Sequence, residues 1–143
     1  GDDLAPLYWS MIEKARATTG VEHSNDIEAM RMMCRDLVMK MSEYDVWLMP
    51  SIPGPAREHG WYDMSLDVEA YNKTRMGPDC AFSVPFNASG QPAISLPLHE
   101  TSSGLPIGIQ FVGRDQDEAT LLRLAGQLEE ALPWKDRKPA LLD

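Results

Sequence analysis

The feature that most constrains the fold is a pair of strand-like segments in the second half of the chain. Residues 93–99 read AISLPLH and residues 106–113 read PIGIQFVG, and both segments are mostly apolar. The linking residues ETSSGL contain serine and glycine, which suit a hairpin turn. The spacing predicts two neighbouring antiparallel strands in one sheet.

A run of prolines and a glycine leads into the first of these strands. Residues 85–97 read PFNASGQPAISLP. Pro85 and Pro92 lack an N–H group, so we expect them before a strand or at its start. Gly90 permits a backbone turn that a side chain would hinder. The run therefore predicts a turn that feeds a strand, with Pro97 at the end of the strand or at a bulge.

Apolar residues at helical spacing predict two helices in the first third of the chain. The first is expected over residues 4–17 and should end near Thr19-Gly20. The second is expected to begin at Asn25, because Asn25 and Glu28 make a capping-box pattern. Its apolar stripe continues to Met41.

The middle of the chain alternates between apolar and irregular segments. Residues 44–50, YDVWLMP, are predicted to form a buried strand that its final proline stops. Residues 51–64 hold prolines and glycines and should form a surface loop. A third helix is expected over about residues 65–76, after which Gly77-Pro78 should break the chain.

A last amphipathic helix is expected over residues 121–132, with acids and a possible cap in front of it at Asp117, Glu118 and Thr120, and Pro133 should end it. With the strands, these helices predict an α/β chain of about four helices and three to four strands. No repeat, low-complexity tract or linker divides the sequence, so residues 1–143 should form a single domain.

Charge and composition exclude several classes of function. The chain has 13 basic and 22 acidic residues and a net charge of −9, which repels nucleic-acid phosphates and anionic lipid headgroups. It contains no apolar run long enough to span a bilayer, and its first ten residues lack the pattern of a secretion signal. Cys34 and Cys80 belong to no CxxC pair, so we expect reduced, packed thiols and a cytoplasmic protein.

No familiar catalytic or metal-binding motif is present. His23, His59 and His99 lack the spacing of metal ligands, so we expect neither a metal site nor a cofactor. There is no GxSxG elbow and no phosphate-binding glycine loop. Ser89 beside Gly90 could be a nucleophile, but no motif identifies its base. The alternative, which we favour, is a turn serine that hydrogen-bonds its own backbone.

Four blocks of sequence together suggest a family. They are YDVWLMPSIP (44–53), NASGQPAISLP (87–97), GLPIGIQFVGR (104–114) and DEATLLRLAGQLE (117–129). The second block fits the pattern N-x-[TS]-G-x-P-A-[IL]-S-[VL]-P, and in this order and spacing the blocks resemble the amidase signature family. The tail at 128–139, LEEALPWKDRKP, resembles the ending of a bacterial subgroup that includes 6-aminohexanoate-cyclic-dimer hydrolase.

The resemblance implies a hydrolase of carbon–nitrogen bonds in linear or cyclic amides, with a mixed sheet between helical layers. Enzymes of this family are several times longer, so the chain resembles their C-terminal portion. Their catalytic lysine, bridging serine on a cis peptide and nucleophilic serine lie in the N-terminal half, and no segment here matches them. In that mechanism the lysine activates the nucleophile through the bridging serine, and backbone N–H groups stabilise the oxyanion. We therefore expect no amidase activity from this chain alone.

The resemblance also implies that the segment before Asn87 contributes to a substrate-pocket wall, with contact positions at Cys80 and Val84. In amidotransferase A subunits that act on glutamine, an aspartate takes the place of Cys80 and faces the amino group of the substrate. Because an ammonium without a counter-charge is costly to bury, this wall should suit a neutral or apolar part of a small amide. The alternative is that Cys80 and Val84 are ordinary core residues.

Other roles stay open at this point. The chain could dock a partner, as amidotransferase subunits do, or it could be a free-standing domain that was never joined to a catalytic half. A helix face or sheet edge left uncovered could also support a homodimer.

Overall fold

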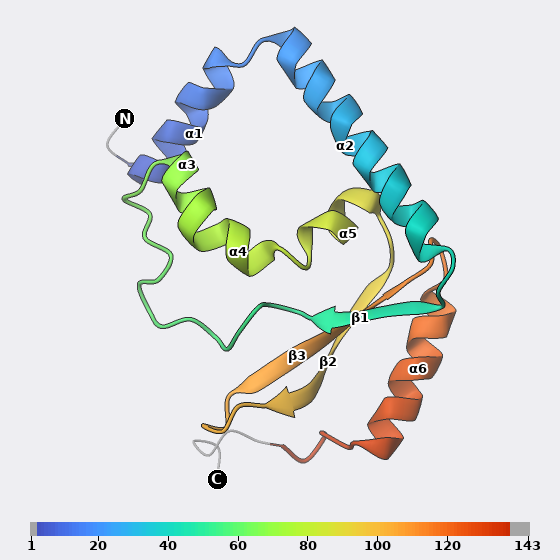
Figure 1. Ribbon diagram of the computed structural model, residues 1–143. Helices are drawn as coiled ribbons and strands as arrows, with labels where there is room; N and C mark the ends of the chain where they lie inside the picture. The colour runs from blue at the N-terminus through green and yellow to red at the C-terminus, as the bar shows by residue number, and fades with distance from the viewer. Residues whose placement is uncertain (1–2, 138–143) are drawn as a thin grey trace.

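The computed structural model describes residues 3–137 and combines helices with one small sheet (Figure 1). In chain order its elements are α1 (Pro6–Ala17), α2 (Gly20–Met41), β1 (Val46–Pro50), α3 (Val68–Tyr71), the π-helical turn η1 (Asn72–Met76), α4 (Gly77–Cys80), α5 (Val84–Ser89), β2 (Ala93–Glu100), β3 (Pro106–Gly113) and α6 (Glu118–Ala131). The predicted α/β class is confirmed. The last helix is also confirmed, and the carboxylate of its N-cap, Asp117, accepts a hydrogen bond from the Thr120 N–H at 3.3 Å.

The strands form an antiparallel sheet in which β3 lies between β1 and β2. The predicted hairpin between β2 and β3 is confirmed, and its turn contains Gly104 with a φ of 80°. The pairing register of β2 shifts between Leu96 and His99. Pro97 therefore lies at an irregular step of the ladder, as the sequence predicted.

The segment before β2 is a short helix, which the sequence did not predict. Pro85 lies before the strand, as expected, and occupies the first turn of α5, where a missing N–H has no helical partner to lose. The predicted turn at Gly90 is confirmed, and it is the left-handed end of this helix, with a φ of 77°. The short helix escaped prediction because six residues that include a proline show no helical period.

Helix α2 starts earlier than expected. Its N-cap is Thr19, whose Oγ1 accepts from the Glu22 N–H at 3.2 Å while the Glu22 carboxylate accepts from the Thr19 N–H at 2.8 Å. The capping box expected at Asn25 and Glu28 is therefore wrong. Both residues lie inside the helix, where Glu28 pairs with Arg31 at 3.6 Å. Residues 19–22 and residues 25–28 both fit the capping-box spacing, so the spacing alone could not choose between them.

Gly77-Pro78 does not break the chain, contrary to expectation. The turn η1 widens the helix, because the Gly77 N–H donates to the carbonyl oxygen of Asn72, five residues earlier. A side chain at position 77 would overlap that oxygen. The wider turn also accommodates Pro78, which has no N–H to donate. The third helix consequently runs from Val68 to Cys80 in three joined pieces.

Neighbouring residues of β3 point to opposite faces of the sheet, and helices pack against both faces. On one face, Phe111 packs against Leu121 of α6. On the other face, Val112 is fully buried with Met41 of α2, and Phe86 of α5 completes this cluster. The sheet thus anchors α6 on one side and the ends of α2 and α5 on the other.

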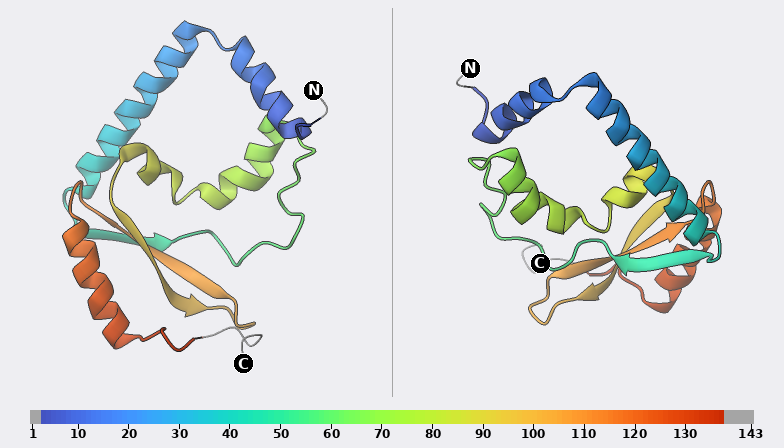
Figure 2. Two further views of the ribbon diagram at one scale, coloured as in Figure 1. Left: turned by 180° about the vertical axis from the view of Figure 1, so that it is seen from behind. Right: turned by 45° about the horizontal axis from the view of Figure 1, so that its top comes forward.

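The other helices form an open frame beside the sheet (Figures 1 and 2). At one corner of the frame α1 packs on α3, and Ser10 Oγ accepts from the Val68 N–H at 2.7 Å. Much of α2 is uncovered, and its Met32, Met33 and Met39 are 63%, 66% and 64% exposed. Within residues 3–137, none of the helices has the length and apolar run that crossing a bilayer requires.

Candidate functional site

The two predicted pocket residues lie at the corner where α4 turns into α5. Cys80 is the last residue of α4, and its half-buried thiol donates to Sδ of Met76 at 3.2 Å. Val84 begins α5 and is 54% exposed. Between them, the Ser83 N–H donates to the carbonyl oxygen of Cys80 at 3.1 Å. Both side chains therefore belong to one turn, and their contact with a substrate stays a prediction.

Val84 also lines an apolar groove between α2 and α5, which we call the α2–α5 groove. Its volume is about 250 Å³, and its lining is formed by Met30, Met33, Cys34, Leu37, Val84, Pro85 and Ala88. Cys80 is not part of this lining. Because the lining is apolar apart from the Cys34 thiol, the groove is suited to hold an apolar surface.

A polar cluster that the sequence did not reveal lies one residue before Cys80. Asp79 is 6% exposed, and its carboxylate accepts from Nε of Arg57 at 3.0 and 3.1 Å and from Nη2 of Arg57 at 2.5 Å. The Tyr62 hydroxyl donates to the same carboxylate at 2.9 Å. Arg57 and Tyr62 belong to the loop between β1 and α3, so the cluster ties this loop to α4.

The electrostatics of the cluster keep Asp79 ionised. The Arg57 guanidinium holds the pKa of Asp79 below its ordinary value of 3.8, although burial opposes this and the Tyr62 hydroxyl assists it. The same hydrogen bonds to Asp79 raise the pKa of Arg57 and the pKa of Tyr62. Groups that keep one protonation state around neutral pH are poor general acids or bases. The cluster can therefore position the loop, but it is not suited to proton transfer.

Trp61 joins this cluster to the π-helical turn. The guanidinium carbons of Arg57 and Arg75 lie 4.7 and 4.5 Å from the centroid of its ring, within the range of cation–π attraction. The buried indole N–H makes no hydrogen bond of ordinary geometry, yet its nearness to Asp79 contributes to the lowered pKa of that carboxyl. Because Arg75 lies in η1, the ring links the loop to a second point of the helical segment.

Ser89 has a structural environment rather than a catalytic one. Its hydroxyl is placed to donate to the Phe86 carbonyl oxygen at 3.4 Å or to Oε1 of Gln91 at 3.1 Å. The predicted local hydrogen bond of a turn serine is therefore confirmed. Neither acceptor is a base that could activate a nucleophile. Gln91 is itself buried and donates to the Gly113 carbonyl oxygen at 3.2 Å, which fastens this turn to β3.

Two serine hydroxyls form a hydrogen bond across the sheet. The Oγ atoms of Ser51 and Ser95 lie 2.5 Å apart, and they meet above Gly108 of the central strand. A side chain at position 108 would approach both oxygens too closely, at 2.6 and 2.7 Å from its Cβ. The glycine thus makes room for a bond between the two outer segments of the sheet.

The histidines do not gather in the structure. His23 lies in α2, His59 in the loop after β1 and His99 in β2. The described part of the chain holds no group of three side chains that could ligate a metal ion.

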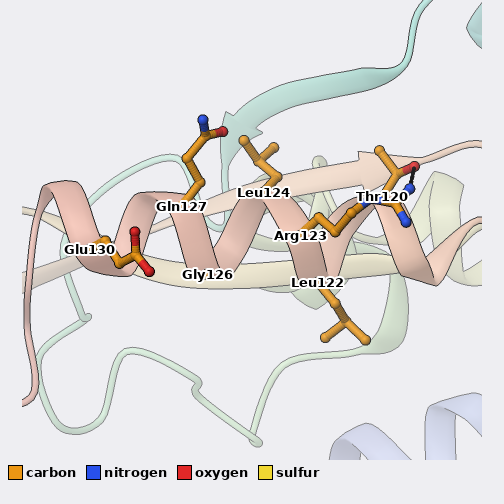
Figure 3. A pocket seen from close by; sticks show the side chains of 7 residues that line it. All are labelled: Thr120, Leu122, Arg123, Leu124, Gly126, Gln127 and Glu130. Atoms are coloured by element: carbon orange, nitrogen blue, oxygen red, sulfur yellow. Dashed lines mark hydrogen bonds between the residues drawn. The ribbon is translucent and has the colours of Figure 1, made fainter.

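A wide depression on α6 is a weaker candidate. It has a volume of about 640 Å³, and all of its lining comes from this one helix: Thr120, Leu122, Arg123, Leu124, Gly126, Gln127 and Glu130. Figure 3 shows that Leu122 points away from Leu124 and Gln127. Arg123 donates to Oγ1 of Thr120 at 3.0 Å instead of reaching toward a ligand. A binding site normally combines polar groups that converge from several elements, and this surface does not.

Comparisons with known proteins connect the α4–α5 corner and the sheet to one family. A family model described as Amidase matches residues 6–122. The 6-aminohexanoate-cyclic-dimer hydrolase of Pseudomonas sp. strain NK87 is 34% identical over 148 residues, which cover 99% of this chain and 30% of that protein. The A subunit of the glutamyl-tRNA(Gln) amidotransferase of Brevibacillus brevis is 36% identical over 108 residues, which cover 76% of this chain and 21% of that protein.

A solved structure agrees with these matches. The structure of 6-aminohexanoate cyclic dimer hydrolase superimposes with a TM-score of 0.92 at 34% identity. The match covers 99% of this chain and 31% of the other one. The chain therefore spans only about 30% of the length of these relatives.

Proposed function

Because this chain belongs to the amidase family, we propose that it forms part of an enzyme that hydrolyses carbon–nitrogen bonds in small linear or cyclic amides. The observation that carries the proposal is a relationship over nearly the whole chain, at 34% identity and a TM-score of 0.92. In this proposal the sheet and α6 supply scaffold, and the α4–α5 corner supplies one wall of the substrate pocket.

The catalytic groups would come from other residues. Among the described residues, the hydroxyls of Ser89, Ser51 and Ser95 meet only carbonyl, amide or hydroxyl oxygens, and none of these takes a proton from a nucleophile at neutral pH. The family resemblance implies a catalytic lysine and two serines outside the blocks that match this chain. We therefore propose that the chain has no amidase activity by itself.

The proposed substrate is neutral where it meets Cys80 and Val84. Cys80 stands where A subunits that act on glutamine carry an aspartate. Asp79 cannot replace that charge, because Arg57 and Tyr62 already occupy its carboxylate. An ammonium at this wall would lack a counter-charge, which is costly away from water. Since the Pseudomonas relative is named a 6-aminohexanoate-cyclic-dimer hydrolase, that cyclic dimer is the first substrate to assay.

The test combines the chain with the rest of an amidase. The chain would be coexpressed with the part of the Pseudomonas enzyme that it does not match, and hydrolysis of 6-aminohexanoate cyclic dimer and of hexanamide would be measured. We expect turnover by the assembled pair and none by either part alone. Turnover by the purified chain would overturn its proposed inactivity, and an inert assembled pair would overturn the proposed activity.

A second measurement addresses the pocket wall. In the assembled pair, a substrate analogue should slow alkylation of the Cys80 thiol if this residue faces the substrate. An unchanged rate of alkylation would favour the alternative that Cys80 is an ordinary core residue. The free thiols of Cys34 and Cys80 also support a reducing compartment, and we propose the cytoplasm, which cell fractionation tests.

A non-catalytic docking subunit is the second candidate function. It is favoured by the 36% identity to the amidotransferase A subunit, which covers 76% of this chain. Genes for partner subunits beside the coding sequence would support this alternative. A homodimer is a further arrangement to test, and light scattering at high protein concentration distinguishes it from a monomer.

A further inference from the structure

The protein exposes more surface than a compact chain of its length. Its accessible area is 10492 Å², whereas a compact chain of this size exposes about 7,400 Å². The excess is roughly 3,000 Å². Part of it lies on the open frame, where Val21, Met32 and Met33 of α2 are 71%, 63% and 66% exposed. Large apolar surfaces of this kind are typical of interfaces.

The α2–α5 groove is the part of this surface with a defined shape. It is walled by two helices, is apolar throughout, and has a volume of about 250 Å³. Met30, Met33 and Val84 at the groove are 42%, 66% and 54% exposed. Methionine side chains adapt to the shape of an incoming apolar surface, which suits a docking site.

The size and charge of the protein argue against a second copy as the occupant. Each copy carries a net charge of −9, so two copies repel each other. A standard interface covers about 800 Å² on each partner, which is far below the excess surface. A larger apolar partner, built like the other part of a domain core, accounts for the excess better.

The solved relative provides such a partner. There the same fold, with a TM-score of 0.92 over 99% of this chain, occupies 31% of a longer chain. We propose that the α2–α5 groove docks the part of an amidase fold that lies outside the region matched by this chain, whether that part is covalently joined or separate. The identity of the partner rests on the proposed function, while the groove and its exposure rest on geometry.

Two methionines of α2 allow a matched test. Met33 lines the groove, whereas Met39 is equally exposed but lies about 240° further around the helix. The probe is the polypeptide used above, the part of the Pseudomonas enzyme that this chain does not match. We expect the wild type and Met39→Glu to copurify with it as a one-to-one complex. Met33→Glu should weaken the complex by about tenfold or more, because docking would bury an unpaired carboxylate, and Met33→Leu should restore it.

The Cys34 thiol gives an independent readout, because it lines the groove. Its alkylation should slow when the complex forms. The proposal is overturned if the wild type forms no complex, if Met33→Glu and Met39→Glu weaken the complex equally, or if Cys34 reacts at an unchanged rate within it. A homodimer that Met33→Glu dissociates would also overturn the proposal in favour of a second copy. A stable complex that hydrolyses no amide would support the docking proposal and would contradict the proposed amide hydrolysis.

Discussion

Arg57 and Tyr62 hold the pKa of Asp79 below its ordinary value, and this makes the stability of the fold sensitive to acid. Asp79→Asn should lower the free energy of unfolding at neutral pH, because Arg57 loses its counter-charge. Since the pKa of Asp79 is lowered in the folded state, its contribution is complete above 3.8 and is lost as the pH falls through the folded-state value. Urea unfolding of both proteins should show a difference in stability that closes below that pH.

Asp63→Asn is the control for this prediction. The Asp63 carboxylate lies in the same loop and, within residues 3–137, accepts only from Ser65, at 2.9 Å from the N–H and 2.6 Å from the hydroxyl. Its replacement should therefore reduce stability less than that of Asp79. Equal losses at neutral pH would mean that the Asp79 cluster does not hold the loop to α4.

Gln91 supports a second prediction at the residue scale. Its buried amide donates to the Gly113 carbonyl oxygen, so Gln91→Ala should remove about 2 kcal/mol from the free energy of unfolding. Gln127→Ala, at an exposed position of α6, should change it by less than about 0.5 kcal/mol. Urea denaturation measures both, and a stable Gln91→Ala protein would show that this hydrogen bond does not fasten the turn to β3.

Sequence motifs suggested Cys80 and Val84 as pocket residues, which stays a prediction, but they did not indicate the contacts around the α4–α5 corner. Cys80 and Val84 follow from the family resemblance, whose motifs are local to one stretch of the chain. Asp79 meets Arg57 across a separation of 22 residues, and Arg57 lies in the irregular loop before α3. No local pattern predicts the path of such a loop, so the ion pair was visible only in the folded structure.

Two glycines in helical segments should respond in opposite ways to replacement by alanine, because only Gly77 lies at the end of the π-helical turn. Gly77→Ala should destabilise the protein by about 1–3 kcal/mol, because the added Cβ overlaps the Asn72 carbonyl oxygen. Gly126→Ala in α6 has free space around its Cβ and should stabilise the protein by up to about 1 kcal/mol. Chemical denaturation measures the change in unfolding free energy for both variants. A gain in stability for Gly77→Ala would contradict the widened turn.

The N-terminus of α2 provides the next prediction. Thr19→Ala removes the side-chain half of the capping box and should cost about 1 kcal/mol. Asn25→Ala replaces a residue inside the helix by a better helix former, so it should cause no loss. Thermal unfolding of both variants tests the assignment. The opposite order of stability would restore Asn25 as the start of the helix.

The elements that the sequence predicted well have strong local signals. The hairpin combines two apolar segments with a glycine-containing turn, and α6 combines an acidic cap with a closing proline. Two of the misjudged segments, α5 and the third helix, contain residues that normally stop helices. Pro85 and Pro78 are tolerated because one lies in a first turn and the other follows a π-helical turn, and neither circumstance can be read from spacing.

The open frame also predicts how the whole molecule responds to denaturant. Because the protein leaves roughly 3,000 Å² more surface exposed than a compact chain, unfolding should expose about one-fifth less new surface. The dependence of the unfolding free energy on urea concentration should be lower by about the same fraction. Equilibrium urea unfolding measures this slope. A slope typical of a compact chain of the same length would indicate that the frame closes in solution.

The irregular step at Pro97 has a consequence for self-assembly. Both outer strands of the sheet contain a proline, Pro50 in β1 and Pro97 in β2. A proline has no N–H to offer an incoming strand, and the bulge beside Pro97 disturbs the ladder further. Neither border of the sheet presents an unbroken row of amide donors, so fibril-like growth by strand addition is hindered at both ends even though apolar surface is plentiful nearby.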